Sequence, residues 1–416
     1  MSNPLYNIAL HSYAGAARLA AIRSPKVSEM LRGQRDCLDS LNSVRAAKAP
    51  AGFDYWFHAA SLGEFEQARP VIDAIKERRP GTTVLLSFFS PSGYKVRHSW
   101  PGADAVVYLP FDTPGRVRRF LDAAQPRRAI FVKYEFWANY IGELSRRNIP
   151  TYIISAIFRE SQRFFKPWGG FWRDVLGKFD HLFVQDGNSL ELLRGIGLGD
   201  RTTVAGDTRF DRVAQIRSQA RNLPEIEIFT AGSRFTLVAG SSWQADEQYY
   251  IPWLHSHSEV KAIIAPHEFD DRRLELLRRS LGMQHTVLLS ELKADPAKAD
   301  GCRYLIIDCF GLLSSIYRYG NIALIGGGFG SGIHNINEAA VYGIPVIFGP
   351  NNHKFREAAE LQACGGGFCY DGSASLASKL DTLLSNCAAL EAAGKAAGEY
   401  IATHTGATDI ILQHFL

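Results

Sequence analysis

The sequence predicts an α/β protein with two doubly wound domains, each built on a parallel sheet. The chain has 416 residues, which is long for one hydrophobic core at roughly 100–200 residues per domain. Short apolar runs alternate with amphipathic stretches along most of the chain, and the alternation breaks once, at 207–234. Strand, helix and strand in this order are typical of βαβ units with right-handed crossovers. We therefore expect two Rossmann-like domains that face each other across a cleft.

The first stretch of alternation begins after Phe53 and contains seven predicted strands. They are 54–58, 83–88, 105–109, 129–132, 151–155, 181–184 and 202–204. Amphipathic patterns between them, such as 66–77 and 117–124, predict helices. We assign 41–206 to this first domain.

The break at 207–234 contains Pro224 beside a Glu-Ile-Glu run and predicts a linker. The alternation then restarts, so that 235–416 forms the second predicted domain. Its predicted strands are 236–239, 260–264, 286–289, 304–307, 322–325 and 345–348. A last predicted helix at 408–415 is a candidate for crossing back to the first domain.

Residues 1–40 form a separate N-terminal segment with an apolar stripe and basic residues close behind. The stripe has helical spacing and consists of Leu5, Ile8, Ala9, Tyr13, Ala16, Leu19 and Ala20. The basic residues are Arg18, Arg23, Lys26, Arg32 and Arg35. Such a helix suits an anionic membrane surface. The alternative is a helix packed on its own domain, and the sequence favours the two equally.

Composition excludes several classes of protein. Apolar residues make up 46% and charged residues 21%, which argues against disorder. With 46 basic and 42 acidic residues the net charge is only +4, so we expect no nucleic-acid partner. The six cysteines include no CxxC pair and none at zinc-ligand spacing with histidine, so we predict no metal site. The sequence contains no apolar run of about 18 residues, so we predict no membrane span.

Ligands of open α/β sheets bind outside the carboxyl ends of the strands, so the loops there are candidate sites. The loop 58–64 follows the first predicted strand, and its small residues let the backbone turn tightly. Glu64 opens the next helix, where the helix dipole favours the ionised carboxylate, so Glu64 is a candidate general base. The alternative is a helix-capping glutamate without chemistry.

The glycine-rich loop 326–332 follows another predicted strand and leads into His-Asn-Ile-Asn-Glu at 334–338. Exposed backbone N–H groups and a following helix N-terminus favour anions, which predicts a phosphate site. Glu338 and Asn335 are candidates for contacts with a ribose. The loop fits neither the dinucleotide fingerprint nor the P-loop, and a purely structural loop is the alternative.

Four further polar loops lie at strand ends, namely 133–139, 206–211, 265–268 and 349–355. Charged groups gathered at one edge of a sheet indicate an anionic substrate. No nucleophile elbow and no Ser-His-Asp order is present, which argues against a hydrolase.

Five motifs in sequence order now identify a family. They are His-Ala-Ala-Ser-Leu-Gly-Glu at 58–64, Glu-Phe-Trp-Ala-Asn at 135–139, Gly-Asp-Thr-Arg-Phe-Asp at 206–211, His-Asn-Ile-Asn-Glu-Ala-Ala at 334–340, and Gly-Ile-Pro-Val at 343–346 with Gly-Pro at 349–350. The ordered set resembles the 3-deoxy-D-manno-octulosonic acid (Kdo) transferases of Gram-negative lipopolysaccharide assembly. The resemblance covers nearly the whole chain and implies a GT-B glycosyltransferase, with the acceptor lipid on the first domain and CMP-Kdo on the second.

The resemblance also implies roles for single residues. Glu64 corresponds to the catalytic base, which deprotonates a sugar hydroxyl of the lipid A precursor for in-line attack on the anomeric carbon of the donor. Arg209 corresponds to the basic residue that offsets charge on the leaving phosphate, so we expect neither metal nor cofactor. Lys133 and Glu135 are further catalytic candidates. Lys133 stands where many relatives have an acid that is thought to assist catalysis, and Glu135 is the acid that remains nearby.

The cytidine-nucleotide contacts of the family fall on a set of residues in the second domain. These are Pro266, His267, Phe310, Gly311, Leu312, Asn335, Ile336, Asn337 and Glu338. His267 stands where an arginine is common, and Ile336 stands where a proline is usual. These departures indicate a divergent branch of the family.

The main hypothesis is therefore transfer of Kdo from CMP-Kdo to lipid IVA by a peripheral or monotopic enzyme at the cytoplasmic face of the inner membrane. Another GT-B glycosyltransferase with a UDP-sugar donor and a non-catalytic nucleotide- or lipid-binding module are the alternatives. Arg159, Arg163 and Lys166 are candidates to hold lipid phosphates, with a solvated basic face as the alternative.

Overall fold

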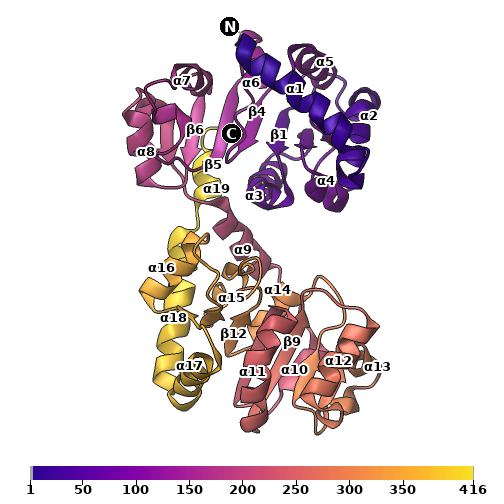
Figure 1. The fold of residues 1–416 in the computed structure, drawn as a ribbon, viewed down its shortest axis with the longest axis vertical. Helices are drawn as coiled ribbons and strands as arrows, with labels where there is room; N and C mark the ends of the chain where they lie inside the picture. The colour runs from indigo at the N-terminus through magenta and orange to yellow at the C-terminus, as the bar shows by residue number, and fades with distance from the viewer. Residues whose placement is uncertain (1–2, 416) are drawn as a thin grey trace. The chain divides into compact units, whose positions relative to one another are not determined.

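The computed structural model describes residues 3–415 and divides the chain into two compact units. The first unit holds the chain up to Arg212 together with the C-terminal residues from Thr405, and the second runs from Val213 to His404. Each unit has one parallel seven-stranded sheet flanked by helices (Figure 1), which confirms the predicted doubly wound α/β class. The predicted linker is helical, with α9 (Thr208–Ser218) and α10 (Pro224–Thr230), and the division falls inside α9.

The sheet of the first unit has the strand order β3-β2-β1-β4-β5-β6-β7. Its strands are β1 (Tyr55–Ala59), β2 (Val84–Phe88), β3 (Ala105–Tyr108), β4 (Ala129–Val132), β5 (Thr151–Ala156), β6 (His181–Val184) and β7 (Thr202–Val204). All seven strands predicted for this unit are present. The order reverses between β1 and β4, and this reversal is where a doubly wound sheet leaves room for a ligand.

Helices of the first unit precede, connect and follow these strands. They are α1 (Pro4–Ala20), α2 (Pro25–Lys48), α3 (Leu62–Arg78), α4 (Pro91–Arg97), α5 (Pro114–Ala124), α6 (Ala138–Arg146), α7 (Gly170–Leu176), α8 (Gly187–Arg194) and α19 (Ala407–Leu412). Both N-terminal helices start with a proline after a capping side chain, Asn3 for α1 and Ser24 for α2. The cap oxygen accepts from backbone N–H groups of the first turn, and the proline lacks an N–H that would be unpaired there.

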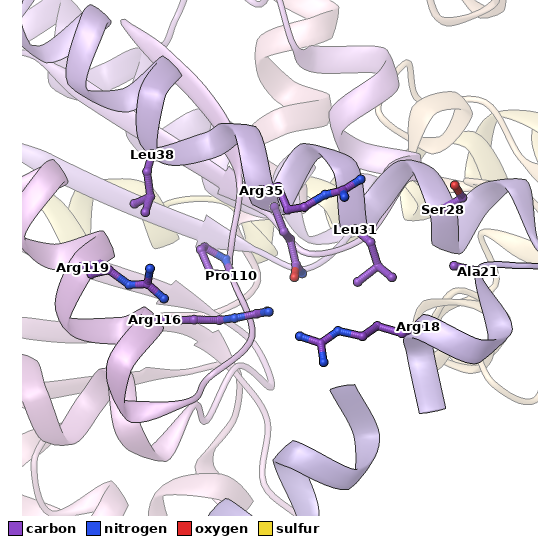
Figure 2. A pocket seen from close by; sticks show the side chains of 10 residues that line it. Arg18, Ala21, Ser28, Leu31, Arg35, Leu38, Pro110, Arg116 and Arg119 are labelled. Carbon is purple, nitrogen blue, oxygen red and sulfur yellow. The ribbon is translucent and has the colours of Figure 1, made fainter. Parts of the chain in front are cut away.

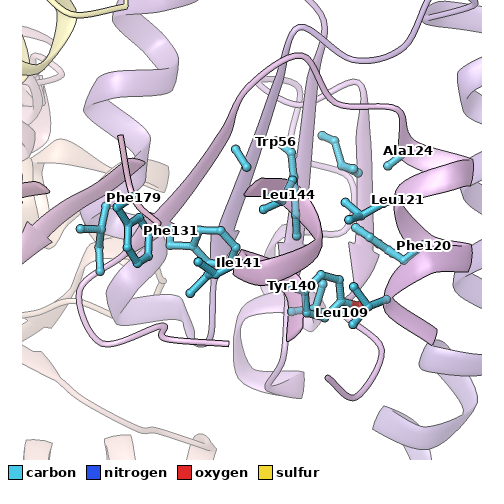
Figure 3. Close-up of a cluster of buried hydrophobic side chains, with 14 of the residues drawn as sticks. Trp56, Leu109, Phe120, Leu121, Ala124, Phe131, Tyr140, Ile141, Leu144 and Phe179 are labelled. Atoms are coloured by element: carbon cyan, nitrogen blue, oxygen red, sulfur yellow. The ribbon is translucent and has the colours of Figure 1, made fainter. Parts of the chain in front are cut away.

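Aromatic side chains fill one face of this sheet. Trp56 of β1 packs between Phe120 of α5 and Tyr140 of α6, with ring centroids 5.1 and 5.6 Å away, and Phe131 of β4 closes the cluster (Figure 3). The opposite face is covered by α3 and by α19, whose Ile411 is fully buried. Figure 1 shows α19, in yellow, within the first unit although it follows the whole second unit in the chain.

The sheet of the second unit has the order β10-β11-β9-β8-β12-β13-β14 and reverses between β8 and β12. Its strands are β8 (Phe235–Ser242), β9 (Val260–Pro266), β10 (Thr286–Leu288), β11 (Tyr304–Ile306), β12 (Ile322–Ile325), β13 (Val346–Phe348) and β14 (Gly367–Cys369). Its remaining helices are α11 (Gln244–Ser256), α12 (Asp271–Leu281), α13 (Leu289–Ala294), α14 (Leu313–Ile316), α15 (Asn337–Ala340), α16 (Arg356–Cys364), α17 (Ser373–Ser385) and α18 (Cys387–His404). The six predicted strands are present, whereas β14 is an addition.

Helix α1 lies on the first unit with one face and leaves the other uncovered. Ala14 and Ala17 are buried, and the hydroxyl of Tyr6 donates to Asp112 Oδ2 at 2.7 Å. On the other side Leu5, Ile8 and Leu19 are 76%, 63% and 71% exposed. The helix is therefore packed on its own unit, as one alternative held, yet much of the predicted apolar stripe faces solvent. Within residues 3–415, no helix combines the length and apolar character needed to cross a bilayer.

Candidate active site

Glu64 lies in the first turn of α3, at the carboxyl end of β1 and beside the reversal of the first sheet. Its Oε2 accepts a hydrogen bond of 3.0 Å from the backbone N–H of Ser61, the N-cap residue. Glu64 therefore caps its helix, as the structural alternative held. This capping role does not decide whether Glu64 can also act as a base. The pKa of Glu64 bears on that question.

Burial raises the pKa of Glu64, and the nearby charge of Glu135 raises it further. The charge of His58 and hydrogen bonds from the backbone of Ala60 and Ser61 act in the opposite direction. Burial prevails, so the pKa of Glu64 lies above its usual value although the residue stands in the first turn of α3. A carboxylate with a raised pKa is a stronger base once it is ionised, which suits proton abstraction.

Glu135 follows β4 and is held by two donors. His58 Nε2 lies 3.0 Å from Glu135 Oε2, and the indole N–H of Trp137 donates to the same oxygen at 2.5 Å. On the other side of the imidazole, His58 Nδ1 lies 2.9 Å from Ser87 Oγ. His58 therefore bridges Glu135 and Ser87 through both of its ring nitrogens. A buried network thus fixes Glu135 close enough to Glu64 to act on its titration.

Lys133 occupies an unusual backbone conformation directly after β4. Its φ is +65°, in the left-handed region that non-glycine residues rarely adopt, at a cost of about 1–3 kcal/mol. Its N–H donates to the carbonyl of Ile154 at 2.9 Å, and its ammonium group lies 5.4 Å from the ring centroid of Tyr134. The strained turn redirects the chain so that Tyr134 and Glu135 follow at the sheet edge.

Arg209 belongs to the first unit and is fixed by Asp207. Its Nη2 and Nε lie 2.8 and 2.9 Å from Asp207 Oδ2, and Gln67 of α3 donates to Oδ1 at 2.9 Å. Burial alone would raise the pKa of Asp207, but the charge and hydrogen bonds of Arg209, with that of Gln67, hold the pKa below its usual value. The carboxylate is therefore ionised and orients a guanidinium that is itself 37% exposed.

Tyr134 follows Lys133 in the loop after β4. Burial raises the pKa of its hydroxyl, which also experiences the charges of Arg159, Glu64 and Arg209. The pKa of Tyr134 thus responds to the charges of both Glu64 and Arg209.

A pocket of about 740 Å³ opens beside Glu135. Its lining is aromatic and basic and consists of Tyr6, Tyr134, Glu135, Phe136, Trp137, Arg159, Ser161, Gln162, Arg163, Phe164, Trp168 and Trp172. The guanidinium carbon of Arg163 lies 4.4 Å from the ring centroid of Trp172. Two of the three predicted phosphate ligands, Arg159 and Arg163, thus line this pocket, whereas Lys166 is not part of its lining.

In the second unit, an aromatic stack lies at the reversal of the sheet. His267, after β9, lies 4.1 Å from His334 and 4.7 Å from Trp243 between ring centroids. The indole N–H of Trp243 donates to His334 Nε2 at 3.0 Å. Burial, with the charge of His267, lowers the pKa of His334 to about 4, so His334 is neutral and can accept. Pro266 is the last residue of β9 and directly precedes this stack.

The other predicted nucleotide contacts differ in accessibility. Phe310 is 74% exposed and stacks on Phe269, and Gly311 follows with a φ of +85°. Asn335 is exposed, and its amide donates to Glu338 Oε1 at 2.9 Å. The side chains of Leu312, Ile336 and Asn337 are buried. Phe310, Asn335 and Glu338 are thus the members of the set whose side chains reach the surface.

The glycine loop 326–332 is packed closely against its own unit. A Cβ on Gly326 would lie 2.2 Å from the carbonyl oxygen of Ser241, and one on Gly328 would lie 2.5 Å from Gly349. The N–H of Gly327 donates to Asp246 at 3.0 Å, and those of Gly330 and Gly332 donate within the loop. The following helix α15 has only 4 residues. The glycines therefore serve packing, as the structural alternative held, and these three N–H groups already have partners.

Two residues that the sequence analysis left without a role complete these arrangements. Trp137 lies inside the motif 135–139. Trp243 directly follows β8, the first strand of the second unit, just as the loop before Glu64 follows β1, the first strand of the first unit. This position could have identified Trp243 as a candidate, because loops at the reversal of a doubly wound sheet carry ligand contacts. Within residues 3–415, no group of three or more metal-ligating His, Cys, Asp or Glu side chains is present.

Two doubly wound sheets with polar loops at both reversals define the GT-B class of glycosyltransferases and their relatives. The solved structure of UDP-GlcNAc 2-epimerase from Neisseria meningitidis shares this fold, with a TM-score of 0.58 and 13% identity over 86% of this chain and 98% of that one.

Residues 25–212 match the family described as 3-deoxy-D-manno-octulosonic-acid transferase (kdotransferase). A curated transferase of this name from Aquifex aeolicus is 28% identical over 336 residues, 79% of this chain and 86% of the relative. Its namesake from Bordetella pertussis is 28% identical over 385 residues, 87% of this chain and 86% of the relative. These matches confirm the predicted resemblance to the Kdo transferase family.

Proposed function

We propose that this protein transfers Kdo from CMP-Kdo to a sugar hydroxyl of a lipid A precursor, lipid IVA, with Glu64 as the general base. One observation carries the proposal: Glu64 is half-buried at the reversal of the first sheet, beside Glu135, with a raised pKa. The resemblance to Kdo transferases indicates the donor sugar, and the surroundings of Glu64 indicate the base.

In the proposed step Glu64 takes the proton of the acceptor hydroxyl as its oxygen attacks the anomeric carbon of Kdo. The bond between that carbon and the phosphate oxygen breaks, and CMP leaves with the electron pair. Arg209, oriented by Asp207, offsets the negative charge on the phosphate. Because a guanidinium supplies this charge, we propose that the reaction needs no metal.

The pocket beside Glu135 supports a phosphorylated acceptor. Arg159 and Arg163 offer planar donors that suit phosphate oxygens. Aromatic walls from Tyr134, Trp137 and Trp168 provide flat apolar surfaces for sugar rings or acyl chains.

The second unit supports a nucleotide donor. Phe310 presents an exposed ring on which a cytosine can stack. The bonded pair Asn335 and Glu338 offers polar groups for ribose hydroxyls. The stack of Trp243, His267 and His334 lies at the sheet reversal, where ligands of such sheets bind.

The uncovered face of α1 supports attachment to the cytoplasmic face of the inner membrane as a peripheral protein. Leu5, Ile8 and Leu19 are exposed on it, and Arg18 and Arg23 are exposed nearby. An apolar stripe beside basic residues suits a helix that lies in an anionic interface.

The experiment that tests the function gives purified protein lipid IVA together with either CMP-Kdo or UDP-N-acetylglucosamine, with and without EDTA. Mass spectrometry should detect a Kdo-modified lipid with CMP-Kdo alone, and EDTA should leave the rate unchanged. Turnover with the UDP-sugar alone would assign a different GT-B glycosyltransferase. Nucleotide or lipid binding without turnover on either donor would assign a binding module.

A further inference from the structure

A second pocket lies away from Glu64, where α1, α2 and α5 meet. It has a volume of about 480 Å³. Its lining consists of Arg18, Ala21, Ser28, Leu31, Gln34, Arg35, Leu38, Pro110, Arg116 and Arg119. Figure 2 shows Arg18 and Arg116 pointing toward each other across this pocket. None of these residues belongs to the catalytic arrangement described above.

Four arginines from three helices line this pocket without an acidic partner. In the chain from residue 3 to 415, none of the four guanidinium groups forms an ion pair with a carboxylate. Arg116 is half-buried, and burial lowers the pKa of its guanidinium, with the charges of Arg18 and Arg119 lowering it further. Like charges gathered in a partly desolvated site repel each other, and a bound anion would remove that repulsion.

Gln34 is a second and independent sign of a missing ligand. Its residue is only 7% exposed and lines the pocket, yet neither Nε2 nor Oε1 has a hydrogen-bond partner. Buried polar atoms are nearly always paired, because an unpaired one loses its bonds to water without replacement. A phosphate satisfies the donor Nε2 with an oxygen, and its hydroxyl or that of an attached alcohol donates to Oε1.

We propose that this pocket binds a phosphate group, held by Arg18, Arg35, Arg116 and Arg119 and read by the amide of Gln34. Guanidinium forks match phosphate oxygens in geometry and charge, and four of them suit a group that carries two negative charges. The site is separate from the proposed transfer reaction and does not depend on it.

The phosphate has two possible sources with the same chemistry. Leu19 and Ile22, at the end of α1 next to Arg18 and Ala21, are 71% and 81% exposed, so a lipid headgroup can enter beside apolar side chains. A soluble phosphate compound can enter the same pocket. Two probes distinguish these sources. Inorganic phosphate represents a soluble compound, and phosphatidylcholine vesicles with or without phosphatidic acid represent a lipid headgroup.

The test compares the wild type with Arg116→Gln and Gln34→Leu, and uses Arg32→Gln as a matched control. Arg32 lies exposed on α2 outside the pocket, and its substitution changes the charge by the same amount. Gln34→Leu removes two unpaired atoms and breaks no hydrogen bond, so the melting temperature without ligand should stay equal or rise. Arg18→Gln, at an exposed position, serves if Arg116→Gln does not fold.

Inorganic phosphate should raise the melting temperature of the wild type and of Arg32→Gln. Each pocket variant should bind phosphate about tenfold more weakly or worse, as expected when a charged hydrogen bond is lost. Phosphatidic acid should increase vesicle binding by the wild type. If the pocket variants lose only this increase, the ligand is a lipid headgroup. If the pocket variants lose only the binding of free phosphate, the ligand is a soluble phosphate compound. Pocket variants that match Arg32→Gln with both probes would overturn the proposal.

Discussion

His58 Nε2 and Glu135 Oε2 lie 3.0 Å apart in the interior of the first unit, where His58 is fully buried. The contact joins the strand β1 to the loop after β4 and fixes a carboxylate beside Glu64. Because the charge of Glu135 raises the pKa of Glu64 and that of His58 lowers it, the pair tunes the proposed base. The hydrogen-bonded pair thus influences the proposed base through the effect of its charges on the pKa of Glu64.

Replacing Glu135 by Gln should shift the acid limb of the kcat/KM profile to lower pH. Glu64 acts as a base only when ionised, and removal of the Glu135 charge lowers the pKa of Glu64. Glu160→Gln, an exposed substitution in the same unit, should leave the profile in place. A profile of Glu135→Gln that stays put or moves to higher pH would contradict the assigned coupling.

Asp207→Asn should lower both turnover and stability. Loss of the charged contact to Arg209 should cost about 1–3 kcal/mol of unfolding free energy at neutral pH. The folded-state pKa of Asp207 is lowered, so its contribution is full above the unfolded value of about 3.9 and vanishes as the pH falls through the folded value. Denaturant titrations over a pH series should therefore converge for wild type and variant in acid. A difference that does not depend on pH would argue against the ionised pair.

The triple variant Leu5→Gln, Ile8→Gln and Leu19→Gln should lose membrane binding and keep its stability. The three side chains are exposed, so their replacement by another good helix former should change the unfolding free energy by at most about 0.5 kcal/mol. Each apolar side chain removed from the interface weakens binding by about 1.5–3 kcal/mol, or roughly tenfold or more. Sedimentation with anionic vesicles measures the loss. Leu276→Gln, at an exposed position of α12, is the control. Unchanged vesicle binding by the triple variant would show that the attachment surface lies elsewhere.

Phe310→Ala should weaken the binding of CMP about 5- to 150-fold, since stacking of a base on an aromatic ring contributes about 1–3 kcal/mol. The ring is 74% exposed, so the unfolding free energy should hardly change. Isothermal titration with CMP gives the dissociation constants. Met283→Ala, at another exposed position of the second unit, should bind CMP as the wild type does. Equal affinity of Phe310→Ala would remove Phe310 from the nucleotide site.

Local pattern sufficed for most of the fold. Thirteen strands were predictable because buried parallel strands are continuous apolar runs bounded by turn residues. The strand β14, Gly367–Cys369, was missed because 3 residues that include a glycine carry no such signal. The helices α9 and α10 were missed because Pro224 indicated a break, whereas it stands in the first turn of α10.

The site was predictable only in part. The motifs located Glu64, Glu135 and Arg209 in the sequence, but the side chains that surround them depend on the order of the strands. His58 and Glu135 are 77 residues apart and meet because β1 pairs with β4. Trp243 and His334, 91 residues apart, meet because β8 pairs with β12. The arginine pocket likewise depends on how α1 and α2 lie against α5, which local patterns do not specify.

The turnover of Glu64→Gln with CMP-Kdo and lipid IVA tests most directly whether Glu64 is the general base. Glu77→Gln, an exposed substitution on the same helix α3, is the matched control. Glu64→Gln should reduce kcat by about 10²–10⁴-fold and leave the affinity for CMP close to that of the wild type. A reduction of less than about tenfold in a folded Glu64→Gln protein would show that another group removes the proton.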